Sequence, residues 1–244
     1  MMGTPDFHRK WICMALLVGS AAFAKEATVS ARVELTTEGG HGKGRQSGNV
    51  VFWLSPMGIP AAPLPAITPN MANLRLAQHN KSFEPHLLVV PVGSEVEFPN
   101  RDPFFHNVFS LFDGKRFDLG LYEAGSTRMV RFDKPGISYI FCNIHAEMSA
   151  VVVALNTPYY GISNPRGQLV IPHVPFGRYT LHVWYETALP EALNSMTREI
   201  TISDDAPSLG VFKIPATSVP PTHQNKYGKD YEPPTPDNPA YPHP

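Results

Sequence analysis

Alternation of apolar and polar residues predicts β-strands along most of this chain. Between positions 27 and 35 every second residue is apolar, as in Val29, Ala31 and Val33, which is the pattern of a strand buried on one face. Further strand-like runs occupy residues 49–54, 87–92, 95–98, 108–112, 128–133, 138–142, 150–155 and 168–183, and a turn at residues 174–177 divides the last of these into two. No run between positions 74 and 156 has a convincing helical period. The predicted fold class is therefore all-β, built as antiparallel sandwiches.

Glycine and proline separate these strands into groups. Residues 38–48 contain five glycines and predict a loop, and residues 55–70 contain five prolines and predict an irregular connection. Gly93 lies between the strands at 87–92 and 95–98 and predicts a short hairpin. The two strands before position 56 cannot bury a core by themselves, so they must pack against a later part of the chain.

Residues 1–24 have the features of a secretory signal peptide. A basic start at residues 8–10 precedes the apolar residues 11–23 and a small-residue cleavage site at residues 22–24. The apolar run is too short to span a bilayer, and a signal anchor is the alternative interpretation. The mature protein is therefore predicted to be periplasmic or secreted, without a membrane span.

Charge and composition narrow the class of protein further. The chain has 244 residues, a formal net charge of −1 and 17% charged residues, and this near-neutral balance argues against nucleic-acid binding. Its 26 prolines and 18 glycines suit many short strands joined by turns. Residues 215–244 contain nine prolines and predict an extended, disordered tail.

The candidate chemistry lies in residues 141–148, where Cys142, His145 and Met148 follow one another at intervals of three. Cleavage of the signal peptide leaves Cys142 as the only cysteine, whereas exported proteins normally pair theirs. A metal that holds the sulfur as a thiolate explains a lone cysteine, and a buried inert thiol is the alternative. With His106 from upstream, the set comprises a thiolate, two imidazoles and a thioether, the ligands of a blue copper site.

Two other metal sites are less compatible with this set. Structural zinc accepts Cys and His but needs four strong ligands, and a thioether is a poor one. A binuclear copper site needs two cysteines in the loop, and residues 141–148 contain one. Mononuclear copper is therefore the preferred interpretation.

The sequence around these ligands resembles a known family. The run FEPHLLVVPVGSEVEFPNRDPFFHNV and the later run FDKPGISYIFCNIHAEM are similar to cupredoxins of the plastocyanin/amicyanin type. This resemblance covers residues 74–156 and implies an antiparallel Greek-key cupredoxin sandwich. It also implies one type 1 copper ion bound by His106, Cys142 and His145, with Met148 as a weak axial ligand.

The same resemblance assigns roles to residues beside the copper. Asn107 matches the family residue whose side chain ties down the ligand loop. In this family the loop histidine lies near the surface at one end of the sandwich, surrounded by apolar loops. Phe104 and Phe105 are therefore expected beside His145 as a docking patch for a redox partner, and a place in the core is their alternative.

Residues 157–214 predict a second, small β-sandwich. The run GQLVIPHVPFGRYTLHVWYE resembles the prealbumin-like, carboxypeptidase-regulatory-like type of domain. That family normally begins with two strands such as those at 27–35 and 49–54. We therefore expect a discontinuous domain made of residues 27–56 and 157–214, with the cupredoxin domain of residues 74–156 inserted between its halves.

Together these features predict an exported protein that holds one copper ion and serves electron transport. The implied partners are redox proteins such as a c-type cytochrome or a periplasmic dehydrogenase, in a methylamine-utilization-like setting. A copper-binding and delivery protein is one alternative, although the chain has no Met- or His-rich tract. A non-catalytic binding module that uses the second β domain is another. We expect no enzyme and no catalytic residue, because the sequence contains no nucleophile–base motif and no recognisable pair of carboxylates.

Overall fold

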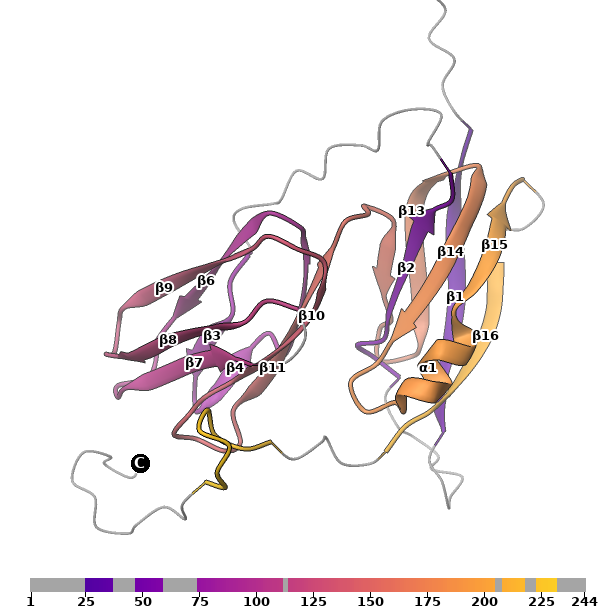
Figure 1. Ribbon diagram of the computed structural model, residues 1–244. Helices are drawn as coiled ribbons and strands as arrows, with labels where there is room; N and C mark the ends of the chain where they lie inside the picture. Colours follow the sequence, from indigo (N-terminus) through magenta and orange to yellow (C-terminus); the bar gives the residue numbers. More distant parts are fainter. Residues whose placement is uncertain are drawn as a thin grey trace, which may run out of the picture.

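The computed structural model describes residues 25–36, 47–58, 74–111, 114–204, 208–217 and 223–231. The predicted signal peptide, most of the proline-rich connection and the end of the tail lie outside the described residues. Figure 1 shows two groups of strands, and α1 (Pro190–Met196) is the one helix of the described part of the chain. The predicted all-β fold class is confirmed. None of the described residues belongs to a helix long and apolar enough to cross a membrane.

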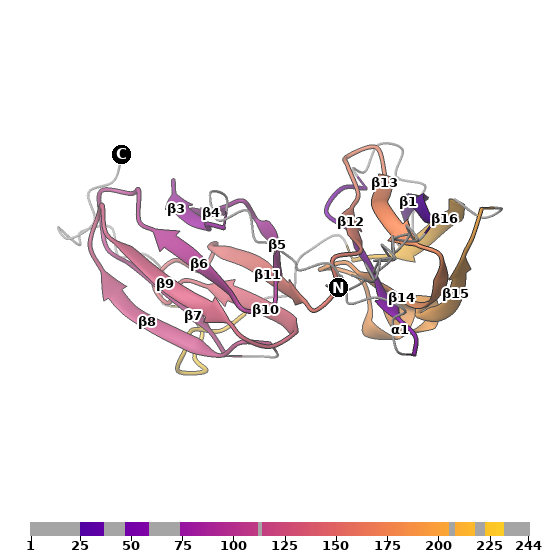
Figure 2. The same ribbon diagram turned by 90° about the horizontal axis from the view of Figure 1, so that it is seen from above.

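We call the strands between residues 74 and 156 the inserted sandwich. Its main sheet has the order β5-β11-β10-β7-β8, and β6 pairs with β9 in a second layer, visible in Figure 2. Alternating side chains such as Val96, Phe98 and Val130 fill the core between the layers. The strands are β3 (Ala77–His79), β4 (Ser82–Glu84), β5 (Leu87–Pro91), β6 (Ser94–Pro99), β7 (His106–Ser110), β8 (Phe117–Tyr122), β9 (Thr127–Phe132), β10 (Gly136–Phe141) and β11 (Ser149–Leu155).

The hairpin predicted at Gly93 is wrong. Strand β5 pairs in parallel with β11, whereas β6 pairs antiparallel with β9, so the chain crosses from one sheet to the other at this turn. Gly93 has a φ of 93°, a conformation that glycine adopts without the steric cost of a side chain. The local pattern predicted both strands correctly, but their pairing partners lie 28 or more residues away in sequence.

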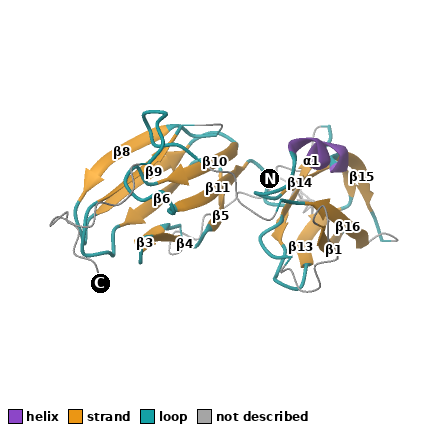
Figure 3. Cartoon of the chain, turned by 90° about the horizontal axis from the view of Figure 1, so that it is seen from below, coloured by secondary structure: helices purple, strands orange, loops and turns teal. Residues whose placement is uncertain are grey.

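The remaining strands form what we call the flanking sandwich. One sheet has the order β13-β1-β16 and the other the order β12-β2-β14-β15. Phe52, Leu181 and Phe212 are among the buried residues of its core, and α1 packs along β14 on one side, as Figure 3 shows. The strands are β1 (Glu26–Thr36), β2 (Val51–Pro56), β12 (Tyr160–Ile162), β13 (Gln168–Pro175), β14 (Gly177–Trp184), β15 (Arg198–Ile202) and β16 (Ser208–Pro215).

The pairing of β1 and β2 bears on the domain organisation. Strand β1 pairs with β13 and β16, and β2 pairs with β12 and β14. Both early strands therefore complete sheets whose other members follow residue 157. This pairing supports our proposal of a discontinuous domain, made of residues 27–56 and 157–214, around an insert at 74–156.

A third apolar cluster joins the two sandwiches. Strand β11 is apolar on both faces: Val152 lies in the core of the inserted sandwich, whereas Val151 and Val153 belong to the joining cluster. Trp184 of β14 and Val51 of β2 contribute to this cluster from the flanking sandwich. Burial of apolar surface on both faces explains why β11 has no polar alternation.

Part of the predicted disordered tail has a defined structure. Strand β16 continues to Pro215, and residues 223–231 pack against the inserted sandwich, where the gold segment runs in Figure 1. Tyr231 and His223 supply aromatic rings and hydrogen-bonding groups that bind this segment to its neighbours. Residues 223–231 contain no proline and form neither a helix nor a strand, and the high proline content of the tail as a whole does not exclude docking by a few specific side chains.

Candidate metal centre

The predicted ligands converge at one end of the main sheet of the inserted sandwich. His106 is the first residue of β7, and Cys142 follows the last residue of the neighbouring strand β10. Residues 142–148 form the loop from β10 to β11, which we call the ligand loop. Within it the Cys142 N–H donates to Met148 O at 3.3 Å and the Met148 N–H donates to His145 O at 3.1 Å. The sheet thus fixes two strand ends, and the loop turns back on itself between them.

Three donor atoms face one point in this site. The Cys142 Sγ lies 3.8 Å from the Nδ1 of His106 and 3.6 Å from the Nδ1 of His145, and all three atoms lie within 4.8 Å of one another. Metal–sulfur and metal–nitrogen bonds are about 2.0–2.3 Å long, so donors at these separations can share one ion. All three residues are buried. The donor set fits a soft transition metal such as copper.

Both imidazoles are prepared to act as neutral ligands. Burial, together with the neighbouring His106, lowers the pKa of His145 to about 4. Burial also lowers the pKa of His106, although Asp102 opposes this shift. Neutral imidazoles can bind a metal through an unprotonated nitrogen. At neutral pH both rings are therefore already neutral, and a metal can bind without first displacing a proton from an imidazolium.

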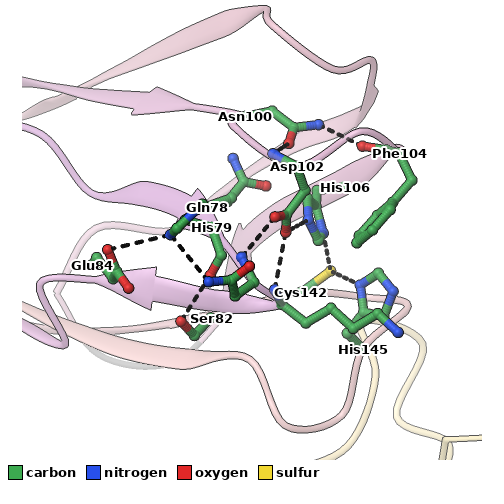
Figure 4. Close-up of polar contacts among 12 residues, drawn as sticks. Gln78, His79, Ser82, Glu84, Asn100, Asp102, Phe104, His106, Cys142 and His145 are labelled. Carbon is green, nitrogen blue, oxygen red and sulfur yellow. Dashed lines mark hydrogen bonds and ion pairs between the residues drawn. The ribbon is translucent and has the colours of Figure 1, made fainter. Parts of the chain in front are cut away.

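Asp102 fixes the orientation of the first histidine. Its Oδ2 lies 2.7 Å from the Nε2 of His106, which places the ring proton on Nε2 and leaves Nδ1 facing the sulfur. The carboxylate also accepts the N–H groups of Asn80 at 2.6 Å and Lys81 at 3.0 Å. Burial would raise the pKa of Asp102, but the contacts with Lys81, His106 and Asn80 outweigh it and the pKa is lowered. Figure 4 shows the carboxylate between the turn and the ring.

Cys142 is surrounded by groups with opposite effects on its charge. Burial raises the pKa of its thiol, while the backbone N–H groups of Asn107, Ile144 and His145 act to lower it. Backbone N–H groups that point at a sulfur stabilise the thiolate form. The site therefore favours a neutral thiol while no cation is present and provides donors for the thiolate that a cation would require.

Met148 and Asn107 differ in how well they match their predicted roles. Met148 is fully buried in the same apolar cluster as Cys142, which is compatible with a weak axial ligand. The Asn107 side chain donates to Asp118 Oδ1 at 2.7 Å, and not to the ligand loop. Its Oδ1 is buried and has no hydrogen-bond partner among the described residues. The direct tie that the resemblance implied is therefore absent from the described contacts.

Phe104 and Phe105 take different positions beside the site. The ring of Phe104 lies 5.1 Å from the His106 ring and 5.6 Å from the His145 ring, measured between centroids. It therefore covers both imidazoles, as Figure 4 shows. The side chain of Phe105 is 53% exposed. Phe104 is half-buried, so Phe105 offers the larger exposed apolar surface of the two.

Asp102 matches the cupredoxin-like pattern of the sequence, but the sequence assigned it no role at this site. It lies four residues before His106, in the segment Asn100-Arg101-Asp102, and its N–H donates to Asn100 Oδ1 at 3.0 Å. An acidic residue so close to a predicted ligand is a usable signal, because metal-binding histidines commonly donate their second nitrogen to a carboxylate.

Comparisons with known proteins find cupredoxins among similar structures. No family model matches the chain, and no curated protein matches it. A purple cupredoxin from Nitrosopumilus maritimus is 21% identical, over 34% of this chain and 100% of its own, with a TM-score of 0.31. A reduced variant of amicyanin is 21% identical, over 38% of this chain and 96% of its own, with a TM-score of 0.32. The copper-containing nitrite reductase (NirK) from Thermus scotoductus SA-01 is 25% identical, over 41% of this chain and 25% of its own, with a TM-score of 0.32. These are partial likenesses, and the function proposed below rests on the site itself.

Proposed function

We propose that this chain is a type 1 (blue) copper protein that carries single electrons between redox partners. The observation that carries the proposal is the buried convergence of Cys142 Sγ with the Nδ1 atoms of His106 and His145. Three such donors, with Met148 buried in the same apolar cluster as Cys142, suit copper in both of its oxidation states. Met148 would be the weak fourth ligand.

Copper in this site would supply a one-electron couple near the surface of the protein. The residues of the chain would keep the site nearly unchanged between the two oxidation states. Adjacent strands hold His106 and Cys142, and Asp102 prevents rotation of the His106 ring. The backbone N–H groups around the sulfur keep its charge stabilised. A preorganised set of ligands limits rearrangement when an electron arrives or leaves.

A resident ion is a better interpretation than copper delivery. His106 and Cys142 are fully buried, and the exposed fraction of His145 is only 9%. A protein that passes its metal to a partner must present its ligands to that partner, and here the donors face inward. Zinc remains disfavoured because the residue that completes the set is a thioether.

We also propose a periplasmic or secreted location and a redox protein as the partner. A periplasmic or secreted protein with a single cysteine in its mature chain avoids wrong disulfides if that cysteine binds a metal. A c-type cytochrome or a periplasmic dehydrogenase would be a suitable partner. Redox encounters of this kind use small interfaces, and we propose the exposed Phe105 beside the site as part of the contact surface.

The contact surface can be tested by truncating the exposed ring. Phe105→Ala should slow electron exchange with a c-type cytochrome several-fold and leave the visible spectrum unchanged. Val211→Ala is the matched control, because Val211 is 55% exposed but lies on the flanking sandwich. Equal exchange rates for both variants would place the contact elsewhere.

The proposed function is tested by adding one equivalent of Cu(II) to the metal-free protein. We expect an intense blue absorption from thiolate-to-copper charge transfer and the narrow copper hyperfine splitting of a type 1 site in the electron paramagnetic resonance spectrum. Cys142→Ser should abolish both signals. A colourless oxidised protein that retains zinc in competition with copper would overturn the proposal.

A further inference from the structure

The end of the described chain lies directly against the ligand loop. Residues 223–231, which we call the C-terminal clamp, follow β16 after a short segment outside the described residues. In Figure 1 this gold segment runs beside the end of the inserted sandwich that carries the site. The clamp is more than 70 residues away from the loop in sequence, so local propensity does not explain the contact.

Three hydrogen bonds connect the clamp to the ligand loop. The Tyr231 hydroxyl donates to Cys142 O at 2.7 Å. The N–H of Lys226 donates to Asn143 Oδ1 at 2.9 Å, and the Nε2 of His223 lies 2.9 Å from Ala146 O. The clamp therefore contacts the backbone of the predicted thiolate ligand itself and two further points of the loop.

Aromatic packing supports these polar contacts. The His223 ring stacks on the Phe141 ring, with centroids 4.0 Å apart and planes inclined by 24°. The Tyr231 ring meets the His223 ring edge-on at 5.3 Å. The side of the loop around Phe141 is thus covered by the chain's own segment and is not available as a docking surface for a partner.

The clamp also replaces the tie that Asn107 does not make directly. Lys226 Nζ donates to Asp118 Oδ2 at 2.8 Å, and the other oxygen of that carboxylate accepts the Asn107 amide at 2.7 Å. Since the Lys226 N–H binds Asn143, a continuous path runs from Asn107 through Asp118 and Lys226 to the loop. The ligand loop is secured from outside its own domain.

We propose that the C-terminal clamp is a positioning element of the metal centre, with Tyr231 as its principal residue. The ligand loop contains no proline. Among the described residues, its main chain closes on itself through two backbone–backbone hydrogen bonds. An unsupported loop of this kind would sample many conformations before a metal binds. The hydroxyl of Tyr231 restricts the carbonyl of Cys142 and so holds the sulfur in place. This role rests on the proposed function of the site.

The inference is tested first in the full-length, metal-free protein. Tyr231→Phe removes one hydroxyl, and Tyr227→Phe is the matched control because Tyr227 lies in the same segment and is 70% exposed. The hydroxyl donates to Cys142 O and lies 3.2 Å from His223 Nδ1. Its removal should therefore accelerate amide hydrogen exchange of residues 143–148 by about fivefold or more, while the control leaves it unchanged. His223→Leu should accelerate it through the separate contact with Ala146.

The second test uses the copper-loaded protein. Tyr231→Phe should release copper to a chelator about fivefold faster and change the copper hyperfine splitting, with unchanged far-ultraviolet circular dichroism. If Tyr231→Phe and His223→Leu both match the Tyr227→Phe control in hydrogen exchange and in copper release, the clamp has no positioning role, even where the site is blue. If loop exchange responds but no blue site forms, the clamp is upheld as a support of the loop and the proposed function fails.

Discussion

The two sandwiches have similar apolar cores but differ in the polar groups that they bury. In the flanking sandwich the buried polar residues are Ser47, Thr157 and Ser163. In the inserted sandwich the buried polar residues are Gln78, Ser94, Asn100, Asp102, His106, Asn107, Ser110, Ser138 and His145. Ionisable side chains occur only in the second set of the described residues. We infer that the buried hydroxyls of the flanking sandwich stabilise the fold, whereas the buried ionisable residues of the inserted sandwich form the metal site.

The buried hydroxyls of the flanking sandwich serve the backbone. Ser163 Oγ donates to Ser47 O at 2.6 Å and accepts the Val50 N–H at 3.0 Å, and Thr157 Oγ1 donates to Leu54 O at 2.7 Å. Each hydroxyl satisfies main-chain groups where strands meet. In the inserted sandwich Ser138 and Asn100 also bind the main chain. His106 and His145, by contrast, direct donor atoms at a point that they share with Cys142. A buried polar side chain indicates chemistry only when the backbone does not account for it.

The largest predicted loss of stability results from a substitution in the apolar core of the flanking sandwich, and it tests whether this sandwich affects the metal site. Phe52 is fully buried and meets the Phe212 ring edge-on at 4.6 Å. Phe52→Ala should lower the free energy of unfolding by about 3–5 kcal/mol, measured by urea denaturation of the full-length protein. Copper loaded at low denaturant should give the unchanged blue spectrum. An altered spectrum would show that the two regions do not separate fold from site.

The second prediction concerns Asp102 in the inserted sandwich. Asp102→Ala should destabilise the metal-free protein by about 2 kcal/mol, because the N–H groups of Asn80 and Lys81 and the His106 ring lose their acceptor. Thr157→Val in the flanking sandwich should cost about 1 kcal/mol by the same argument. Urea denaturation measures both variants, and copper affinity should fall only for Asp102→Ala. A loss of copper affinity in Thr157→Val would contradict the division between the two sandwiches.

Much of the site could be predicted from sequence because its ligands are close together along the chain. Cys142, His145 and Met148 occupy one loop, and His106 begins a strand with a clear apolar pattern. The structure brings the donor atoms of the two histidines and the cysteine together. The strands with long apolar or alternating runs were also predicted, since alternation of side chains reports which face is buried. The strands β3, β4, β8, β12, β15 and β16 were not predicted.

The parts that escaped prediction depend on contacts between distant residues. The apolar run of β11 could not reveal that Val151 and Val153 face a second sandwich, because period-two alternation disappears when both faces are buried. A fragment of residues 74–156 alone would expose that apolar face to water. The clamp was missed for a related reason: a proline-rich composition carries no information about which residues Tyr231 contacts.

The third prediction concerns Met148, which lies in the apolar core of the inserted sandwich and is also the proposed axial ligand. Met148→Leu nearly conserves volume and should cost less than about 1.5 kcal/mol of stability. Copper should remain bound and its reduction potential should rise, because loss of a weak axial donor disfavours Cu(II). The control is Met129→Leu, since Met129 is 55% exposed. Cyclic voltammetry checks both, and complete loss of copper from Met148→Leu would show that the thioether is not a weak ligand.

The smallest effect concerns a titratable contact that joins the two sandwiches. His86 Nε2 lies 2.6 Å from Glu186 Oε2, and His86 Nδ1 lies 3.0 Å from Ser149 O. The hydrogen bond to Glu186 raises the pKa of His86 above its ordinary value, although burial opposes the shift. A raised pKa in the folded state means that the protonated pair stabilises the fold fully below the unfolded pKa of about 6.5. This stabilisation is lost as the pH rises through the folded pKa.

His86→Gln should therefore reduce stability most at about pH 6 and progressively less toward pH 9. The His86 side chain is 42% exposed, so the difference should stay below about 1 kcal/mol. Thermal unfolding of the metal-free protein at several pH values measures this difference in stability.

The matched control is His173→Gln. His173 pairs with Glu26 at 3.2 Å within the flanking sandwich, and its side chain is almost fully solvated. If the charged pair stabilises the contact between the sandwiches, the loss of stability in His86→Gln should depend on pH more strongly than the loss in His173→Gln. A pH-independent difference would show that His86 packs at the joint without using its charge.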